Sequence, residues 1–328
     1  NRALYFNTTG YSNVAIGTEA LVSNTSRSNL VAVGDSALYS NGYGAVNAYE
    51  ATENSAFGSK ALYLNTTGYY NTATGSNALR SNSTGAQNTA NGTGALISNT
   101  IGSANTSMGL NSMFYNSSGN NNTGIGNGAL TFNTTGNNNT ATGFLALNNN
   151  TTGYSNVAIG TEALLRNTDR SNLVAVGDSA LYTNGVGAVN AYDATANSAL
   201  GSKALFANTT GFYNTATGSN ALKNNTTGAQ NTANGTGALF SNTTGNSNTV
   251  MGLNAMFSNS TGNDNAAVGG FALTLNTTGI KNTGLGYGTL FNNSTGNNNT
   301  ATGNGALFFN TIGYSNVAIG TEALAKNT

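Results

Sequence analysis

Residues 7–17 read NTTGYSNVAIG, and the same eleven letters return unchanged at residues 150–160. At residues 310–320 they return with one change, as NTIGYSNVAIG. The stretch belongs to a repeat with the consensus N-T-T-G-x-x-N-T-A-x-G-x-x-A-L-x-x. The repeat recurs every 17 residues, except in two units of 24 residues that begin at Asn41 and Asn184. A fixed period of this kind indicates a solenoid in which each repeat forms one coil.

The consensus decides which kind of solenoid is expected. One Leu and two Ala per unit are too little apolar surface for a unit to fold alone, whereas stacked units bury a continuous column. Asn, Thr and Gly recur in every unit and are poor helix formers. Short segments between Gly and Asn corners are typical of strands and turns. The sequence therefore predicts an all-β fold, a parallel β-solenoid or β-roll with one coil per 17 residues.

Three columns of the repeat have predicted structural roles. The Leu column, which includes Leu21 and Leu79, is expected to be buried along the bore. The glycine ten residues after each start, such as Gly75, suits a corner with positive φ or a close approach of two backbones. The Asn four residues before that glycine, such as Asn71, is expected to form a ladder of side-chain amides from coil to coil.

Composition and comparison of the two long units exclude several function classes. Ten Lys and Arg balance ten Asp and Glu, which argues against a nucleic-acid partner. The absence of Cys removes thiol chemistry, and no apolar run approaches the roughly 18 residues of a membrane span. Glu50 and Glu53 in the first long unit become Asp193 and Ala196 in the second, so a paired-carboxylate mechanism fails. We predict no catalytic residue, no metal site and no cofactor.

One motif resembles a known family. Residues 13–17, 156–160 and 316–320 read NVAIG, and residues 30–34 and 173–177 read LVAVG. These motifs resemble the head repeats of trimeric autotransporter adhesins, the YadA-like heads, and the NTTG pattern is similar to that of bacterial surface and tail-fibre-like proteins. The resemblance implies a left-handed β-roll in a homotrimer, at the cell surface or outside the cell. It also implies an adhesive fibre that binds itself and a host-cell surface, matrix or glycans.

The coils themselves repeat in a longer order. The series of units in residues 7–149 returns in residues 150–309, with one additional coil, and a third series begins at residue 310. We therefore predict that residues 1–328 form one continuous solenoid, excerpted from a longer chain.

Two sets of residues are candidate contact sites. The long units are expected to leave the coil as protrusions that carry Tyr49, Glu50, Tyr192 and Asp193. Because side chains alternate along a strand, the residue after each buried Leu is expected to point outward. This column is a candidate self-association stripe, in a homotrimer or a filament: Tyr39, Tyr63, Phe114, Tyr182, Phe206, Phe240, Phe257, Phe291 and Phe308.

Two other functions and one modification fit the same pattern. An ice-binding solenoid would use a threonine column: Thr72, Thr89, Thr106, Thr123 and Thr140. A carbohydrate-binding rod would stack sugars on outward aromatic side chains. Many unit starts are also glycosylation sequons, although the same letters suit turns. These candidate sites include Asn7, Asn65, Asn133, Asn150 and Asn208.

Overall fold

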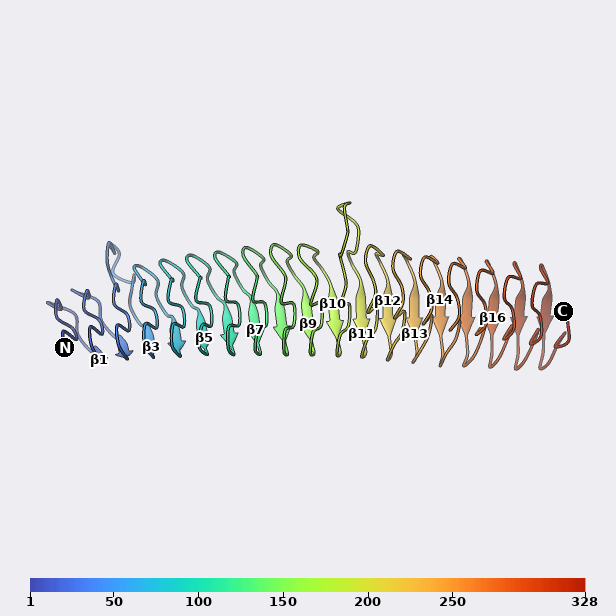
Figure 1. Ribbon diagram of the computed structural model, residues 1–328, viewed down its shortest axis with the longest axis horizontal. Coiled ribbons are helices and arrows are strands. Elements are labelled where there is room, and N and C mark those ends of the chain that lie inside the picture. The colour runs from blue at the N-terminus through green and yellow to red at the C-terminus, as the bar shows by residue number, and fades with distance from the viewer. Residues whose placement is uncertain (328) are drawn as a thin grey trace. The chain divides into compact units, whose positions relative to one another are not determined.

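The computed structural model describes residues 1–327, which contain eighteen short strands and no helix (Figure 1). Contacts divide the chain into two compact units, Asn1–Thr161 and Glu162–Thr328, which we describe separately. The prediction of one continuous solenoid with blocks at residues 7–149 and 150–309 stays a prediction.

Unit 1 contains nine strands of three residues each. They are β1 (Val14–Ile16), β2 (Val31–Val33), β3 (Ser55–Phe57), β4 (Thr72–Thr74), β5 (Thr89–Asn91), β6 (Thr106–Met108), β7 (Thr123–Ile125), β8 (Thr140–Thr142) and β9 (Val157–Ile159). Each strand pairs in parallel with the next one along the chain, and the register repeats: Thr72 lies beside Thr89, and Ala73 beside Ala90. Each coil therefore ends where the next begins, one strand spacing further along.

Unit 2 has the same construction. Its strands are β10 (Val174–Val176), β11 (Ser198–Leu200), β12 (Thr215–Thr217), β13 (Thr232–Asn234), β14 (Thr249–Met251), β15 (Ala266–Val268), β16 (Thr283–Leu285), β17 (Thr300–Thr302) and β18 (Val317–Ile319). Parallel pairing continues from β10 to β18, for example between Thr215 and Thr232. The predicted all-β parallel β-solenoid with 17-residue coils is confirmed.

The strands follow from the T-A-x segment of the consensus. In most strands the small middle residue, such as Ala73 or Ala90, is buried, and its two neighbours face outward. This alternation is the two-residue period of a strand. The glycine that follows ends the strand: Gly75 has a φ of 125°, and a Cβ built there would lie 2.7 Å from the carbonyl oxygen of Gly92. Both predicted reasons for this glycine column, positive φ and close backbones, are confirmed.

The Leu column fills the core as predicted. Its members in unit 1 and at the start of unit 2 have no exposed surface: Leu21, Leu38, Leu62, Leu79, Leu96, Leu130, Leu147 and Leu164. The expectation that this column lies in a strand was wrong. Leu79 stands in a turn with a φ of 50°, and its N–H donates to the carbonyl oxygen of Ala95 on the next coil, at 3.0 Å. After most members of the column the next side chain is half-buried, as at Tyr63, whereas Arg80 after Leu79 is exposed.

Two ladders of asparagine side chains run beside the core. In the predicted ladder, the backbone N–H of Asn88 donates to Oδ1 of Asn71 at 3.0 Å. The second ladder was not predicted and uses the Asn that opens each repeat. There, Nδ2 of Asn99 donates to Oδ1 of Asn82 at 2.7 Å and to the carbonyl oxygen of Gly102 at 2.9 Å. These Asn side chains are fully buried, so each coil satisfies the polar groups of its neighbour.

Candidate functional site

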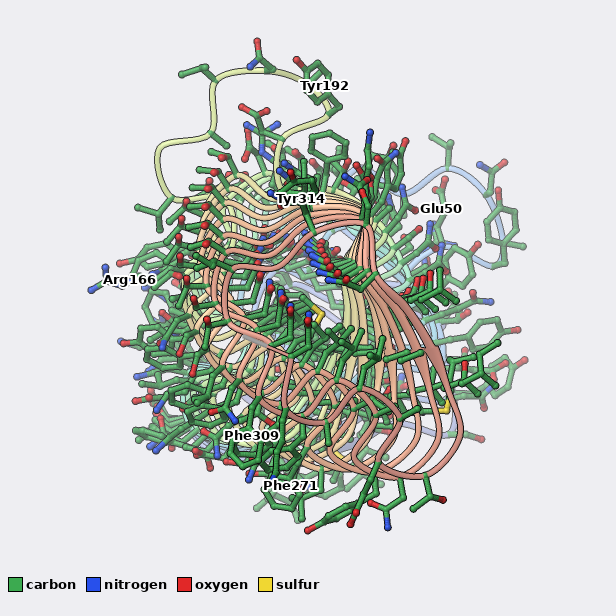
Figure 2. The ribbon with its side chains drawn as sticks, turned by 90° about the vertical axis from the view of Figure 1, so that its right-hand side faces the viewer. Glu50, Arg166, Tyr192, Phe271, Phe309 and Tyr314 are labelled. Carbon is green, nitrogen blue, oxygen red and sulfur yellow. The ribbon has the colours of Figure 1, made fainter. Side chains whose placement is uncertain are left out.

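The two long units leave the coil path as protruding loops, at residues 42–53 in unit 1 and 185–196 in unit 2 (Figures 1 and 2). Val46 and Val189 occupy the same place in the two loops and are 86% and 87% exposed. The predicted departure from the coil is confirmed. The loops are the most pronounced departures from an otherwise regular surface (Figure 1), and this makes them candidate sites for a specific contact.

A carboxylate fixes the shape of the first loop. Oε2 of Glu50 accepts the backbone N–H groups of Val46 and Asn47, at 2.7 and 3.0 Å. Oε1 of Glu50 accepts the side-chain amide of Asn47 at 2.8 Å. The backbone N–H of Asn47, with these other donors, holds the pKa of the Glu50 carboxyl below its usual value. Glu50 thus binds the turn of its own loop, which explains why it is only half-exposed.

Asp193 has the same role in the second loop. Its Oδ2 accepts the N–H groups of Val189 and Asn190 at 3.1 and 3.0 Å. The backbone N–H of Asn190 holds the pKa of Asp193 below its usual value, against the opposing effect of burial. The change from Glu to Asp therefore keeps the loop, although the side chain is shorter.

An arginine braces each loop from the preceding coil, and the sequence analysis missed both arginines. The guanidinium of Arg27 donates to the carbonyl oxygens of Asn47 and Ala45, both at 2.8 Å. Arg170 bonds the corresponding carbonyls of Asn190 and Ala188 at 3.0 and 3.2 Å. A signal was present in the sequence, because the stretch RSNLVAVGDSAL at residues 27–38 recurs unchanged at 170–181 directly before each long unit.

The first loop also interrupts the second asparagine ladder. Nδ2 of Asn41 donates to the carbonyl oxygen of Ala51 at 2.9 Å, within its own long unit. Oδ1 of Asn24 is therefore left buried without a hydrogen-bond partner among the described residues. On the other side the ladder resumes, since Nδ2 of Asn65 donates to Oδ1 of Asn41 at 2.8 Å. The loop therefore costs the ladder one buried hydrogen bond at Asn24.

A cleft of about 500 Å³ lies between the first loop and the neighbouring coils of unit 1. Tyr11, Tyr49 and Tyr70 line it and are 69%, 56% and 47% exposed. Arg27 and Glu53 also line it, together with small polar side chains. The predicted contact residue Tyr49 thus faces a concave, mixed aromatic and polar surface. Glu50, the other candidate contact residue of this loop, instead accepts hydrogen bonds from the loop backbone.

The predicted aromatic stripe forms stacked pairs on adjacent coils. The ring centroids of Tyr39 and Tyr63 are 5.0 Å apart, and those of Phe240 and Phe257 are 4.7 Å apart. The same stacking joins Tyr182 to Phe206 and Phe291 to Phe308. Phe114 instead packs edge-to-face on Tyr115. All nine stripe residues are half-buried, because neighbouring coils cover part of each ring. Their role in self-association stays a prediction.

A more exposed apolar column runs along the outer face of the strands. In unit 1 the third strand residue is both apolar and 38% to 61% exposed on five coils: Ile16, Phe57, Met108, Ile125 and Ile159. Val33 at the same position of β2 is half-buried. In unit 2 the same position carries Leu200, Met251, Val268, Leu285 and Ile319. We call this set the strand-face column. The first strand residue, often Thr, lies beside it on the same face.

Four of the five candidate glycosylation sites are buried. Asn65, Asn133, Asn150 and Asn208 have no exposed surface, and their side-chain amides donate within the second ladder. The folded chain therefore gives a glycosyl group no access to these four nitrogens. Asn7 is half-buried, and its Nδ2 donates to the carbonyl oxygen of Gly10 at 2.9 Å.

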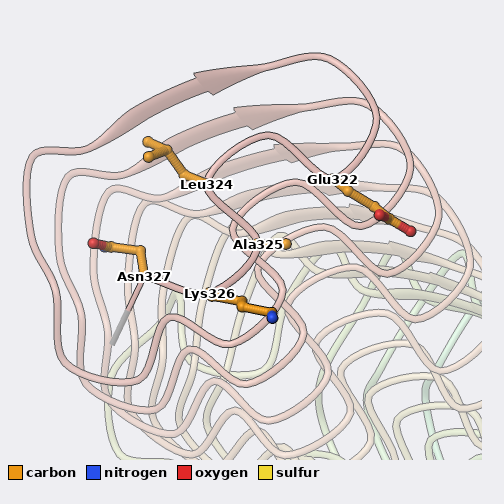
Figure 3. A pocket seen from close by; sticks show the side chains of 5 residues that line it. All are labelled: Glu322, Leu324, Ala325, Lys326 and Asn327. Carbon is orange, nitrogen blue, oxygen red and sulfur yellow. The ribbon is translucent and has the colours of Figure 1, made fainter.

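A shallow hollow lies on the last coil of unit 2 (Figure 3). It is lined by Glu322, Leu324, Ala325, Lys326 and Asn327. Glu322 and Lys326 carry opposite charges, and Leu324 is 52% exposed there, unlike the buried members of its column. Among these lining residues there is no arrangement of groups that would select a ligand.

Residues 1–327 contain no group of three or more His, Cys, Asp or Glu side chains placed to hold a metal ion. None of the described segments forms a helix of the length and apolar character needed to cross a membrane. No protein-family model matches the chain, and no curated protein matches it.

Proposed function

We propose that the protein is a structural, self-associating part of an extracellular fibre or adhesin, and that it has no catalytic role. The observation that carries the proposal is the strand-face column. A run of exposed apolar side chains at one repeat position is a surface that association would bury. Its occupant in this proposal is a second copy of the same chain, in a homotrimer or a filament.

The regular spacing of the column favours a copy of the chain over an unrelated partner. Met108 and Ile125 stand directly beside each other on paired strands, and Val268 and Leu285 repeat this arrangement in unit 2. Two parallel copies have the same 17-residue period, so their apolar side chains can meet on each coil that carries one at this position. The chain also has no net charge, which leaves little electrostatic repulsion between copies.

Sedimentation velocity tests the proposal with a pair of charge substitutions. Met108→Lys with Ile125→Lys places two positive charges on the strand-face column, at positions that are already exposed. The matched control is Thr84→Lys with Thr135→Lys, two exposed positions on the NTTG side of the same unit. We expect the wild type to associate at micromolar concentration. The column variant should dissociate at least about tenfold more readily, which corresponds to about 1.4 kcal/mol.

Two results would overturn self-association through this column. The first is a wild-type protein that sediments as a monomer at micromolar concentration. The second is an equal loss of association in the column variant and its control, since that would reflect net charge alone.

Ice binding is a second candidate, because Thr72 and Thr89 are paired in register and both exposed. A flat sheet of such pairs could order water along the column. The adjacent strand-face position changes from Thr74 to Asn91 and then to Met108, which breaks a two-dimensional threonine array. Thermal hysteresis of the purified protein tests this candidate, and its absence at high protein concentration would reject it.

A further inference from the structure

We propose that the cleft beside the first loop binds a neutral carbohydrate chain. This inference goes beyond the structural role of the protein and does not depend on self-association. It rests on the chemistry of the side chains that line the cleft and on how the loop is held.

Three exposed tyrosine rings come together in the cleft from three different coils. Tyr11 belongs to the first full repeat, Tyr49 to the loop and Tyr70 to the coil after it. The Tyr49 ring packs edge-to-face on Tyr69, with centroids 5.3 Å apart, and Tyr69 packs on Tyr70 at 5.2 Å. Ring packing therefore holds Tyr49 and Tyr70 in place before any ligand arrives. An aromatic face of this kind suits the apolar C–H face of a pyranose ring, and its hydroxyl can bond the sugar's edge.

Polar groups stand beside the rings where sugar hydroxyl groups would lie. Glu53 is exposed and lines the cleft, and its carboxylate can only accept hydrogen bonds. Ser26 and Asn29 are also exposed there and can both donate and accept. Since each sugar hydroxyl is a donor and an acceptor, this mixture fits a carbohydrate better than it fits an apolar ligand.

The charges of the cleft favour a neutral saccharide over an acidic one. The only cationic side chain that lines it is Arg27, and two of its N–H groups already bond loop carbonyls. Glu53 supplies a charge of the opposite sign in the same cleft. An anionic sugar would lie near the Glu53 carboxylate, which has the same charge, while the Arg27 guanidinium is already bonded to the loop carbonyls.

The loop is built to bind without a large ordering cost. Glu50 accepts hydrogen bonds that fix the turn of the loop, and the Arg27 guanidinium donates to the loop carbonyl of Asn47. Oγ1 of Thr52 donates to the carbonyl oxygen of Tyr49 at 2.7 Å. A surface that is already in its binding conformation loses less entropy when a ligand docks. The bracing is what distinguishes this loop from a tolerated insertion.

The second loop provides a comparison within the same chain. It keeps Tyr192 and Tyr213, both exposed, but has Ala196 where the first loop has Glu53. Phe212 replaces Tyr69 as the ring beneath the loop tyrosine, with centroids 5.4 Å apart. The second loop therefore keeps the support and these two exposed tyrosines, and lacks the carboxylate acceptor. We expect the first loop to bind the more tightly of the two.

Isothermal titration of the full chain tests the proposal with three neutral probes: cellohexaose, maltohexaose and chitohexaose. We expect at least one of them to bind with a dissociation constant below about 1 mM. Tyr49→Ala and Glu53→Ala should each weaken that binding by about tenfold or more. Tyr43→Ala is the matched control, because Tyr43 is exposed on the same loop and does not line the cleft.

Three results would overturn the proposal: no binding of any probe at about 10 mM, an equal effect of Tyr43→Ala and Tyr49→Ala, or tighter binding of a sulfated heparin hexasaccharide than of the neutral probes. Circular dichroism of each variant separates loss of the cleft from loss of the fold. Sedimentation of Tyr49→Ala should match the wild type, so failure of carbohydrate binding and failure of self-association are distinguishable.

Discussion

Nδ2 of Asn82 lies 2.8 Å from Oδ1 of Asn65, one coil away, and both side chains are fully buried. The same amide donates to the carbonyl oxygen of Gly85 at 2.8 Å, and Oδ1 of Asn82 accepts from Asn99 at 2.7 Å. One side chain thus joins three coils. It does so with neutral groups, which avoids the cost of burying charges.

Removal of this side chain should destabilise the stack strongly. Asn82→Ala would leave the buried Oδ1 of Asn65 without its hydrogen-bond donor, and would remove one of the two bonds made by the carbonyl oxygen of Gly85 and by Nδ2 of Asn99. We expect a loss of about 3 kcal/mol in the free energy of unfolding, measured by urea denaturation. Asn127→Ala is the control, because Asn127 is exposed and outside both ladders, and it should change stability by less than about 0.5 kcal/mol. Similar losses in the two variants would contradict the role of the ladder.

The repeat predicted the stacking but not every element of the coil. Burial of Leu79, the corner at Gly75 and the ladder through Asn71 followed from periodicity, because only a stacked fold buries one Leu per unit. The ladder through Asn65 was missed, since N-T-T-G has the same letters as an ordinary turn. The placement of the Leu column in a strand failed, because nothing in the sequence marks a leucine such as Leu79 as left-handed.

The loops were harder to read than the coils. The extra residues in each long unit predicted a protrusion, which follows directly from a broken period. The partners of Glu50 could not be predicted, because its bonds to Val46 and Asn47 depend on how the loop turns back on itself. The cleft at Tyr49 brings together residues from several coils, and the order of side chains around a coil is fixed only once the turns are known.

The corner glycines should tolerate no side chain. At Gly75 an added Cβ would lie 2.7 Å from the backbone of Gly92, which cannot yield without separating the coils. We expect Gly75→Ala to lower the free energy of unfolding by more than about 3 kcal/mol. Gly44→Ala is the matched control, since Gly44 also has positive φ, at 75°, but has open space around it. It should cost about 1 kcal/mol, and an equal cost at both sites would rule out close packing as the cause.

A larger residue in the core is balanced by a missing side chain on the strand. Ser112 replaces the usual Ala before the Leu position, and the middle residue of the next strand is Gly124. A Cβ on Gly124 would lie 2.7 Å from Oγ of Ser112. In unit 2, a Cβ on Gly284 would lie 2.8 Å from Oγ1 of Thr289, which follows it within the same repeat.

This pairing predicts a strong coupling between the two positions. Gly124→Ala alone should destabilise unit 1 by about 2 kcal/mol through overpacking. In a Ser112→Ala background, which restores the alanine pair found on other coils, the same change should cost less than about 1 kcal/mol. Thermal denaturation of the four proteins of this double-mutant cycle measures the coupling. A cycle with no interaction energy would show that the two positions do not share space.

The first loop should open in acid. The backbone N–H of Asn47, with the donors beside it, holds the pKa of Glu50 below its usual value, and an opened loop would return the pKa to that usual value. The ionised carboxylate therefore stabilises the closed loop fully above that ordinary value, and this contribution disappears as the pH falls through the lower pKa of the closed form. Amide hydrogen exchange of residues 42–53, corrected for intrinsic rates, should show protection at neutral pH and its loss in that acidic range.

Glu50→Gln should reduce protection at neutral pH and remove the pH dependence. Glu53→Gln should leave both as in the wild type, because Glu53 accepts none of the hydrogen bonds that Glu50 makes to the loop backbone. Retention of the acid-induced loss in Glu50→Gln would show that another group controls the loop.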